Sequence, residues 1–113
     1  DLTVNANILL TISNDTWFGR SIGPAQHLEI AQNRAIEHQM SLIRSTNSGI
    51  SALIDKRGRI LSSLGYFESG QIKQNIEIYR GSTPYNLYGN FFIYLIMVMI
   101  FTVILYIKRT YVR

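Results

Sequence analysis

Residues 8–24 have the sequence ILLTISNDTWFGRSIGP, which joins an apolar run to the start of a helical pattern through a short polar turn. Runs as short as residues 8–12, bounded by polar residues, are typical of strands buried on both faces. Ser13, Asn14 and Asp15 favour a turn after the run. Pro24 suits the first turn of a helix, where its missing N–H costs no hydrogen bond. This stretch therefore predicts a strand, a turn and a helix in succession.

The remaining pattern predicts further strands after the helix. Apolar residues recur with a helical period over residues 24–44, and we expect one long helix there. Residues 50–54 alternate as a strand, residues 55–58 favour a hairpin turn, and residues 59–64 return as its partner. Alternation over residues 72–78 predicts another strand of this group. The fold class is therefore α/β (α+β), with open strand edges that need upstream sequence or another chain to pair with them.

An uncharged run over residues 91–107 precedes a basic C-terminus that contains Lys108, Arg109 and Arg113. The run reaches the lower end of the roughly 17–25 residues that cross a bilayer as a helix. Basic residues beyond such a span favour the cytoplasmic side. We therefore expect a transmembrane helix with a cytoplasmic C-terminus, and residues 1–88 on the periplasmic or other extracytoplasmic side.

Charge and cysteine content exclude several classes of function. The formal net charge is +4, but three of the eleven basic residues lie in the tail, which leaves eight against seven acidic residues. A nucleic-acid-binding surface needs clustered basic residues, so no nucleic-acid partner is expected. The chain has no cysteine, which excludes disulfides, zinc–thiolate sites and a thiol nucleophile within it.

The start of the chain suggests a partial domain. It begins with Asp1 rather than Met, and residues 1–7 lack the charged and apolar regions of a signal peptide. A small domain buries only about 60% of its unfolded surface, so the residues before the span make a poor independent core. We expect residues 1–80 to be the C-terminal part of a domain, followed by a linker at 81–90, a transmembrane helix at 91–107 and a tail at 108–113.

Candidate site residues follow the first expected strand. Ligands of open α/β sheets bind beyond the carboxyl ends of strands, where Asn14, Asp15, Trp17 and Phe18 are expected. Asp15 is suited to orienting a neighbouring group, and Trp17 and Phe18 to lining an apolar substrate pocket. The alternative interpretation is that Asp15 caps a turn and Trp17 packs in the core.

A second candidate loop follows the expected helix. Residues 44–49 place Arg44 and Asn47 where they can approach the same strand ends as Asp15. The alternative is a helix C-terminus with a glycine turn, in which Arg44 interacts favourably with the helix dipole. His27 and His38 are eleven residues apart without a third ligand nearby, so no metal site is expected. No Gly-x-Ser-x-Gly motif supports a serine nucleophile.

Several blocks of this sequence resemble those of apolipoprotein N-acyltransferases. They are LLTISNDTWFG at residues 9–19, SIGP at 21–24, QH at 26–27, Ala31 with Arg34 and Ala35, LIRSTNSGI at 42–50 and GSTPY at 81–85. The blocks occur in the family's order and precede an apolar C-terminal span. The resemblance implies the C-terminal part of a nitrilase-like αββα sandwich of the carbon–nitrogen hydrolase superfamily, followed by one transmembrane helix of a multi-pass bacterial inner-membrane protein.

The resemblance also implies a reaction. The family transfers a fatty acyl group from a phospholipid to the α-amino group of a lipoprotein's diacylglyceryl-cysteine, using a Glu base, an oxyanion-supporting Lys and a Cys that forms a thioester. All three lie upstream of the stretch resembled here, so no catalytic residue is assigned and the chain alone should be inactive. The implied partners are phospholipid, apolipoprotein and the upstream remainder of the enzyme, and no cofactor is implied.

The resemblance gives the candidate residues supporting roles. Trp17 and Phe18 would form pocket walls near the acyl or lipoprotein substrate, and Asn14 and Asp15 would shape the loop beside the nucleophile. Two alternatives remain, a membrane-anchored nitrilase-like amidase fragment and a non-catalytic membrane-tethered binding module. Amide formation on a lipopeptide, as against ammonia release from an amide, distinguishes the first two.

Overall fold

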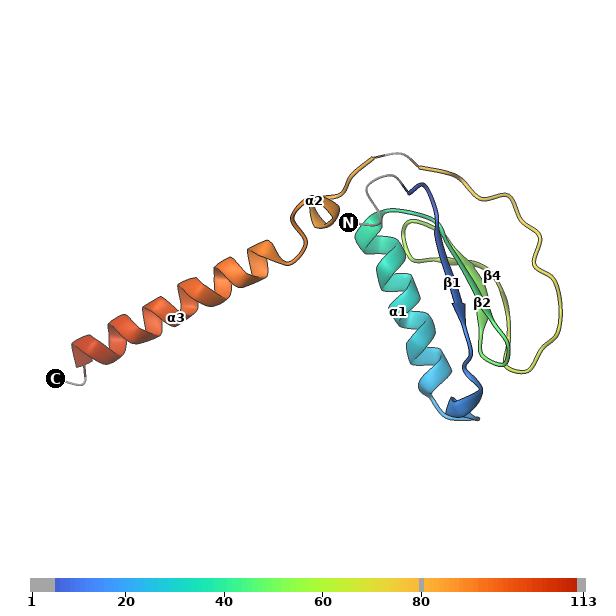
Figure 1. Cartoon of the computed structure of the whole chain (residues 1–113), viewed down its shortest axis with the longest axis horizontal. Coiled ribbons are helices and arrows are strands. Elements are labelled where there is room, and N and C mark those ends of the chain that lie inside the picture. Colours follow the sequence, from blue (N-terminus) through green and yellow to red (C-terminus); the bar gives the residue numbers. More distant parts are fainter. Residues whose placement is uncertain (1–5, 80, 112–113) are drawn as a thin grey trace.

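A four-stranded mixed sheet covered on one face by a helix forms the body of the chain in the computed structural model, which describes residues 6–79 and 81–111. Its elements in order are β1 (Leu9–Ser13), the 3₁₀ helix η1 (Thr16–Phe18), α1 (Gly23–His38), β2 (Leu42–Thr46), β3 (Ser51–Ile54), β4 (Ile60–Leu64), α2 (Pro84–Tyr88) and α3 (Phe91–Tyr111). The strands lie in the order β1-β2-β3-β4. β1 and β2 are parallel, and the two following pairs are antiparallel. The α/β class is confirmed, and α1 runs alongside β1 (Figure 1).

The core lies between α1 and one face of the sheet. Leu28, Ala31 and Ala35 form the buried stripe of α1. They pack against Leu42 of β2 and against Ala52 and Ile54 of β3. Alanine at two of the three helix positions lets the backbone of α1 approach the strands closely. The parallel pairing of β1 and β2 is possible because α1 supplies the crossover connection that parallel strands need.

α1 ends at His38, six residues before the end that the periodicity predicted. Gln39 takes a left-handed conformation with φ of 51°, and its N–H bonds back to carbonyls of the last helical turn. Residues 42–46 then form β2, so the predicted helix was wrong over residues 39–44. Leu42 and Arg44 are both buried, in keeping with a strand that turns alternate residues to one face. The apolar side chains at 42 and 43 fit the period of a helix as well as that of a strand. The pairing of this segment with β1 is what makes it a strand.

The strand predicted at residues 72–78 is also wrong, because residues 65–79 contain no helix or strand. The segment is bound to the sheet by isolated hydrogen bonds instead of a ladder. One of them runs from the hydroxyl of Ser41 to the carbonyl of Glu77 over 2.9 Å. Ser41 precedes β2 in the middle of the sheet, so the segment does not lie along the edge of β4. Alternation predicts a strand only where a neighbouring edge can accept the ladder.

The sheet has open edges among the described residues, as expected. β1 pairs only with β2, and β4 pairs only with β3. On β1, Leu10 is 62% exposed and Ile12 is 77% exposed, on the face turned away from α1. Apolar side chains on an unpaired edge strand mark a surface that further protein normally covers.

α3 is long and apolar enough to cross a membrane by length and composition, with a mean hydropathy of 2.4. Its 21 residues correspond to about 30 Å, the thickness of a bilayer's hydrocarbon core. The helix continues through Lys108 and Arg109 to Tyr111, beyond residue 107 where the expected span ends. The linker before α3 contains α2, and Thr83 fixes it to α1 by donating to the carbonyl of Glu37.

Candidate functional site

A buried ion pair lies at the carboxyl end of β1. The Arg44 guanidinium donates to Asp15 Oδ2 over 2.8 Å, and both side chains are at most 1% exposed. The other carboxylate oxygen, Oδ1, accepts the Ser13 hydroxyl at 2.9 Å and lies 3.1 Å from His27 Nδ1. Arg44 also donates from Nε to the carbonyl of Ile50. Buried charges persist when they are paired and hydrogen-bonded in this way.

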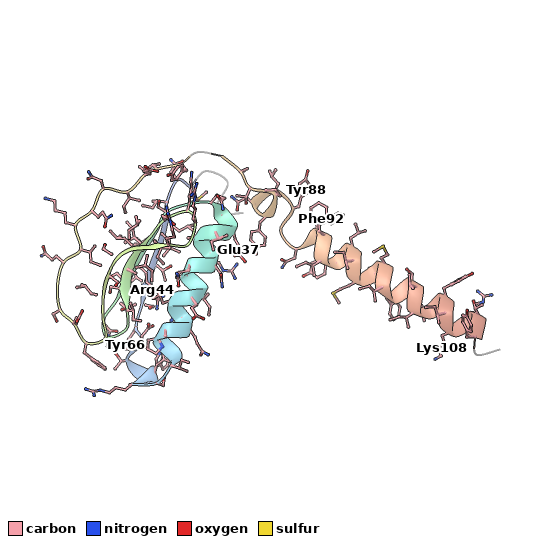
Figure 2. The ribbon with its side chains drawn as sticks, turned by 180° about the vertical axis from the view of Figure 1, so that it is seen from behind. Glu37, Arg44, Tyr66, Tyr88, Phe92 and Lys108 are labelled. Atoms are coloured by element: carbon pink, nitrogen blue, oxygen red, sulfur yellow. The ribbon has the colours of Figure 1, made fainter. Side chains whose placement is uncertain are left out.

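This ion pair joins three elements that are separate in the sequence. Asp15 follows β1, Arg44 lies in β2 and His27 lies in α1. Arg44 is labelled in Figure 2, where it lies on the sheet beside α1. Asp15 therefore acts as a buried connector between the elements, rather than as a simple turn cap, and Arg44 is a strand residue rather than a helix C-terminal one.

Gly49 allows the loop after β2 to approach this carboxylate. A Cβ at this position would lie 2.3 Å from Asp15 Oδ2, well inside van der Waals contact. The glycine is buried among the polar groups of the site. The requirement here is close approach, which is one of the two reasons a chain uses glycine.

Thr16 connects the two candidate loops at the surface. The side chain of Asn14 accepts hydrogen bonds from the N–H and the hydroxyl of Thr16. Asn47 donates to the Thr16 hydroxyl over 3.1 Å, and Ser48 lies 3.0 Å from the same oxygen. The structure therefore brings Asn14, Asp15, Arg44 and Asn47 to one edge of the sheet.

Trp17 and Phe18 differ in their surroundings. Trp17 is 87% exposed, so it does not pack in the core of the described chain. Phe18 is 40% exposed and makes an edge-to-face contact with His27, with ring centroids 6.0 Å apart. Phe18 also lies against Gly23, where a Cβ would come within 2.4 Å of its ring. Phe18 is thus partly fixed, whereas Trp17 projects freely from the same turn.

The arrangement joins a buried ion pair to exposed polar side chains on two loops. It contains no cysteine, and no cluster of three or more potential metal ligands occurs among residues 6–79 and 81–111. Sequence reasoning missed Ser13, Thr16, His27 and Gly49 as members of the site. His27 lies one helical turn after Gly23, on the face of α1 that Asp15 reaches, but its partner is twelve residues away and only the fold reveals it.

Comparison with known proteins identifies the class. Residues 3–83 match the family model described as carbon–nitrogen hydrolase, and the chain belongs to that family. Within it, the chain is similar to proteins named apolipoprotein N-acyltransferase. It is 53% identical to that of Vibrio cholerae over 95 residues, which cover 84% of this chain and 19% of the relative. It is 46% identical to that of Vibrio vulnificus over the same shares.

A third relative extends the same resemblance to another genus. The apolipoprotein N-acyltransferase of Nitrosomonas europaea is 47% identical over 85 residues, which cover 75% of this chain and 17% of the relative. The family resemblance predicted from the sequence blocks is therefore confirmed. The chain spans about a fifth of the length of the curated relatives that it matches.

Proposed function

We propose that this chain is the C-terminal segment of an apolipoprotein N-acyltransferase of the bacterial inner membrane. The complete enzyme would transfer a fatty acyl group from a phospholipid to the α-amino group of the diacylglyceryl-cysteine of an apolipoprotein. The reaction would pass through a thioester on a Cys, with a Glu as general base and a Lys supporting the oxyanion, all upstream of this chain. The identity of 46–53% to proteins of that name is the main support.

The role proposed for this segment is to hold and border the acyl-transfer site. The buried pair of Asp15 and Arg44 fixes the turn that follows β1, and the exposed Trp17 projects from that turn. A large aromatic side chain left in solvent on a rigid turn is suited to contact an apolar substrate. Phe18 and the loop residues Asn14 and Asn47 would border the same site, on the side of the sheet edge where strands end.

The proposed topology places residues 1–88 outside the cytoplasm, with α3 crossing the membrane and Lys108 and Arg109 on the cytoplasmic side. The apolar length of α3 and the basic residues in its last turn support this orientation. Tyr88 and Phe92 lie at the junction of α2 and α3, and Lys108 lies at the opposite end of α3 (Figure 2). Aromatic residues at one end and basic residues at the other fit the two interfaces of a bilayer.

Replacing Trp17 with Ala in the complete enzyme tests the site. We expect kcat/KM for acyl transfer to a diacylglyceryl lipopeptide to fall by about tenfold or more, since a lost large apolar contact of about 1.5–3 kcal/mol corresponds to that range. Ile78→Ala is the matched control, because Ile78 is 64% exposed but lies on the segment leading to the linker. Equal activity of both variants at equal amounts in the membrane would refute the pocket role of Trp17.

A hydrolytic alternative follows from the family description, which names carbon–nitrogen hydrolases. In that case the complete protein would be a membrane-anchored amidase that releases ammonia. Incubation with a phospholipid and a lipopeptide distinguishes the two activities by mass spectrometry. An added acyl chain on the peptide supports the transferase, whereas ammonia release from a simple amide without acylation would overturn it.

A further inference from the structure

Basic side chains gather in the turn between β3 and β4. Lys56, Arg57 and Arg59 occur within residues 55–59, and Asp55 is the acidic residue of this turn. Asp55 pairs with Arg59 over 2.7 Å and accepts the backbone N–H groups of Arg57 and Arg59. The turn is therefore held in one conformation, and the ion pairs among the described residues include none made by Lys56 or Arg57.

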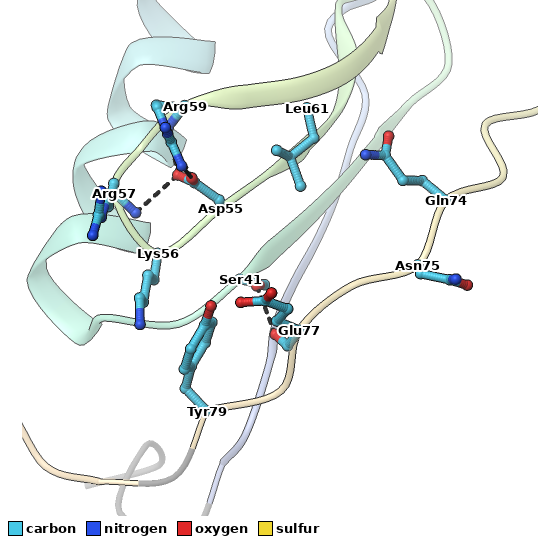
Figure 3. A pocket seen from close by; sticks show the side chains of 10 residues that line it. All are labelled: Ser41, Asp55, Lys56, Arg57, Arg59, Leu61, Gln74, Asn75, Glu77 and Tyr79. Carbon is cyan, nitrogen blue, oxygen red and sulfur yellow. Dashed lines mark hydrogen bonds and ion pairs between the residues drawn. The ribbon is translucent and has the colours of Figure 1, made fainter.

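This turn borders a polar hollow of about 420 Å³. Figure 3 shows the basic side chains of the turn on one side of the hollow and those of Gln74, Asn75, Glu77 and Tyr79 on the other. Lys56 Nζ lies 3.4 Å from the centre of the Tyr79 ring, a cation–π contact that fixes the ammonium group at the rim. Glu77 is the acidic residue on the opposite side, so cations outnumber carboxylates around the hollow.

The basic turn lies at the end of the sheet from which the chain leaves for α3. Gln32 of α1 donates to the carbonyl of Gly58 over 2.7 Å, and Thr83 donates to the carbonyl of Glu37, five residues further along the same helix. A second hollow of about 230 Å³ is lined by both Lys56 and Thr83. The candidate acyl-transfer loops lie at the other end of the sheet, because Ile54 pairs beside Leu42 and not beside Thr46.

The path from Thr83, which lines the second hollow together with Lys56, to the apolar helix is short. α2 and a few extended residues separate Thr83 from Phe91. At about 1.5 Å per helical residue and 3.5 Å per extended residue, the path covers roughly 20 Å. A turn carrying two positive charges that are not paired with Asp55 thus borders the same hollow as the segment that leads into α3.

We infer that the turn at residues 55–59 docks on the anionic phospholipid headgroups of the membrane that α3 enters. The inference rests on the proposed membrane topology and goes beyond the proposed acyl transfer. Lys56 and Arg57 are suited to phosphate oxygens through charge-assisted hydrogen bonds. Such contacts set the height and tilt of the extracytoplasmic domain over the bilayer. The headgroup contacts of the turn lie apart from the proposed acyl-transfer site. The lipids bound there are therefore not the ones that donate an acyl chain.

Hydrogen exchange of the complete enzyme in nanodiscs tests this docking. Nanodiscs of phosphatidylcholine alone are compared with nanodiscs that also contain phosphatidylglycerol. We expect the amides of residues 55–59 and 74–79 to exchange more slowly in the presence of phosphatidylglycerol, and added salt to remove the difference. In Arg57→Gln we expect the protection due to phosphatidylglycerol to fall about fivefold, the factor for one basic residue at an anionic surface.

Arg20→Gln is the matched control, because Arg20 is an exposed arginine in the turn that precedes α1. It should keep the full protection, whereas equal losses in both variants would overturn the inference in favour of a general charge effect. Exchange that is the same in both lipids would also overturn it, even if the enzyme acylates a lipopeptide normally. Failure of the enzyme to insert into nanodiscs would instead overturn the membrane topology, and the docking with it.

Discussion

Two aspartate–arginine pairs with nearly the same distance have very different environments in this chain. Asp15 and Arg44 lie 2.8 Å apart and are at most 1% exposed. Asp55 and Arg59 lie 2.7 Å apart, but Arg59 is 68% exposed. The first pair joins the loop after β1 to β2, at a distance of 29 residues in the sequence. The second lies within one hairpin turn, four residues apart.

The comparison indicates that the distance between two charges does not by itself set what the ion pair contributes to the stability of the fold. A buried ion pair has lost the solvation of both ions, so each partner depends on the other. An exposed pair remains solvated and is screened by salt, so either partner can be lost at small cost. We therefore interpret the Asp15 pair as structural support for the candidate site, and the Asp55 pair as a local brace for the basic turn.

Asp15→Asn should show the largest effect in the chain. The substitution leaves the guanidinium of Arg44 buried without an opposing charge, and we expect the free energy of unfolding to fall by about 3–5 kcal/mol. Thermal unfolding of the complete protein in detergent, together with its amount in membranes, measures the loss. Asp55→Asn is the matched control, since it makes the same chemical change at an arginine-paired residue.

A loss from Asp15→Asn no larger than that from Asp55→Asn would contradict the contrast between the two pairs. It would mean that water reaches Arg44 once the carboxylate is removed. The Ser13 hydroxyl, which is also 3.3 Å from Arg44, would then be a sufficient partner.

Gly49→Ala sharpens the comparison by crowding the buried pair without removing a charge. The added methyl group would meet Asp15 Oδ2 at 2.3 Å, and must displace either the carboxylate or the loop after β2. Overpacking of this kind costs about 1–3 kcal/mol. Thermal unfolding measures the cost, and Gly65→Ala is the control, since a Cβ there would meet only the Glu68 side chain, at 3.2 Å. Equal unfolding temperatures of the two variants would show that the loop yields freely.

The sequence predicted the elements that depend on local pattern. The strand of residues 8–12, the start of the helix near Pro24 and the hairpin about Gly58 all occur within a residue or two of their expected places. The two errors, at residues 39–44 and 72–78, fall where apolar residues fit more than one structure. In both, the outcome depends on whether a neighbouring strand edge is present, which is a property of the whole sheet.

The candidate site was predicted in its position but not in its contacts. The end of the first strand identified Asn14 and Asp15, the loop expected after the helix contributed Asn47, and the structure places all three at one edge of the sheet. The partners of Asp15 could not be derived, because His27 and Arg44 approach it only when α1 crosses back over β1. Gly49 was assigned to a turn, whereas its use lies in contact with a carboxylate from another loop.

Asp55→Asn should have the smallest effect on stability, and this effect should depend on pH. Burial raises its pKa, but the N–H groups of Arg59 and Arg57 and the charge of Arg59 outweigh this, so the pKa lies below the usual value for aspartate. A pKa that is lower in the folded state stabilises the fold above the unfolded value of about 4, and this contribution is lost as pH falls through the folded pKa.

We therefore expect Asp55→Asn to cost about 0.2–1 kcal/mol at neutral pH and nothing once the carboxyl is protonated. Unfolding temperatures of the two proteins, measured from neutral pH downwards, should converge below pH 4 or so. Added salt should reduce the difference at neutral pH, because Arg59 is exposed. A difference that persists unchanged in acid would show that the charge of Asp55 does not brace the turn, because the protonated carboxyl group carries none. The pair at residue 55 would then contribute nothing through its charge, in contrast to the buried pair at residue 15.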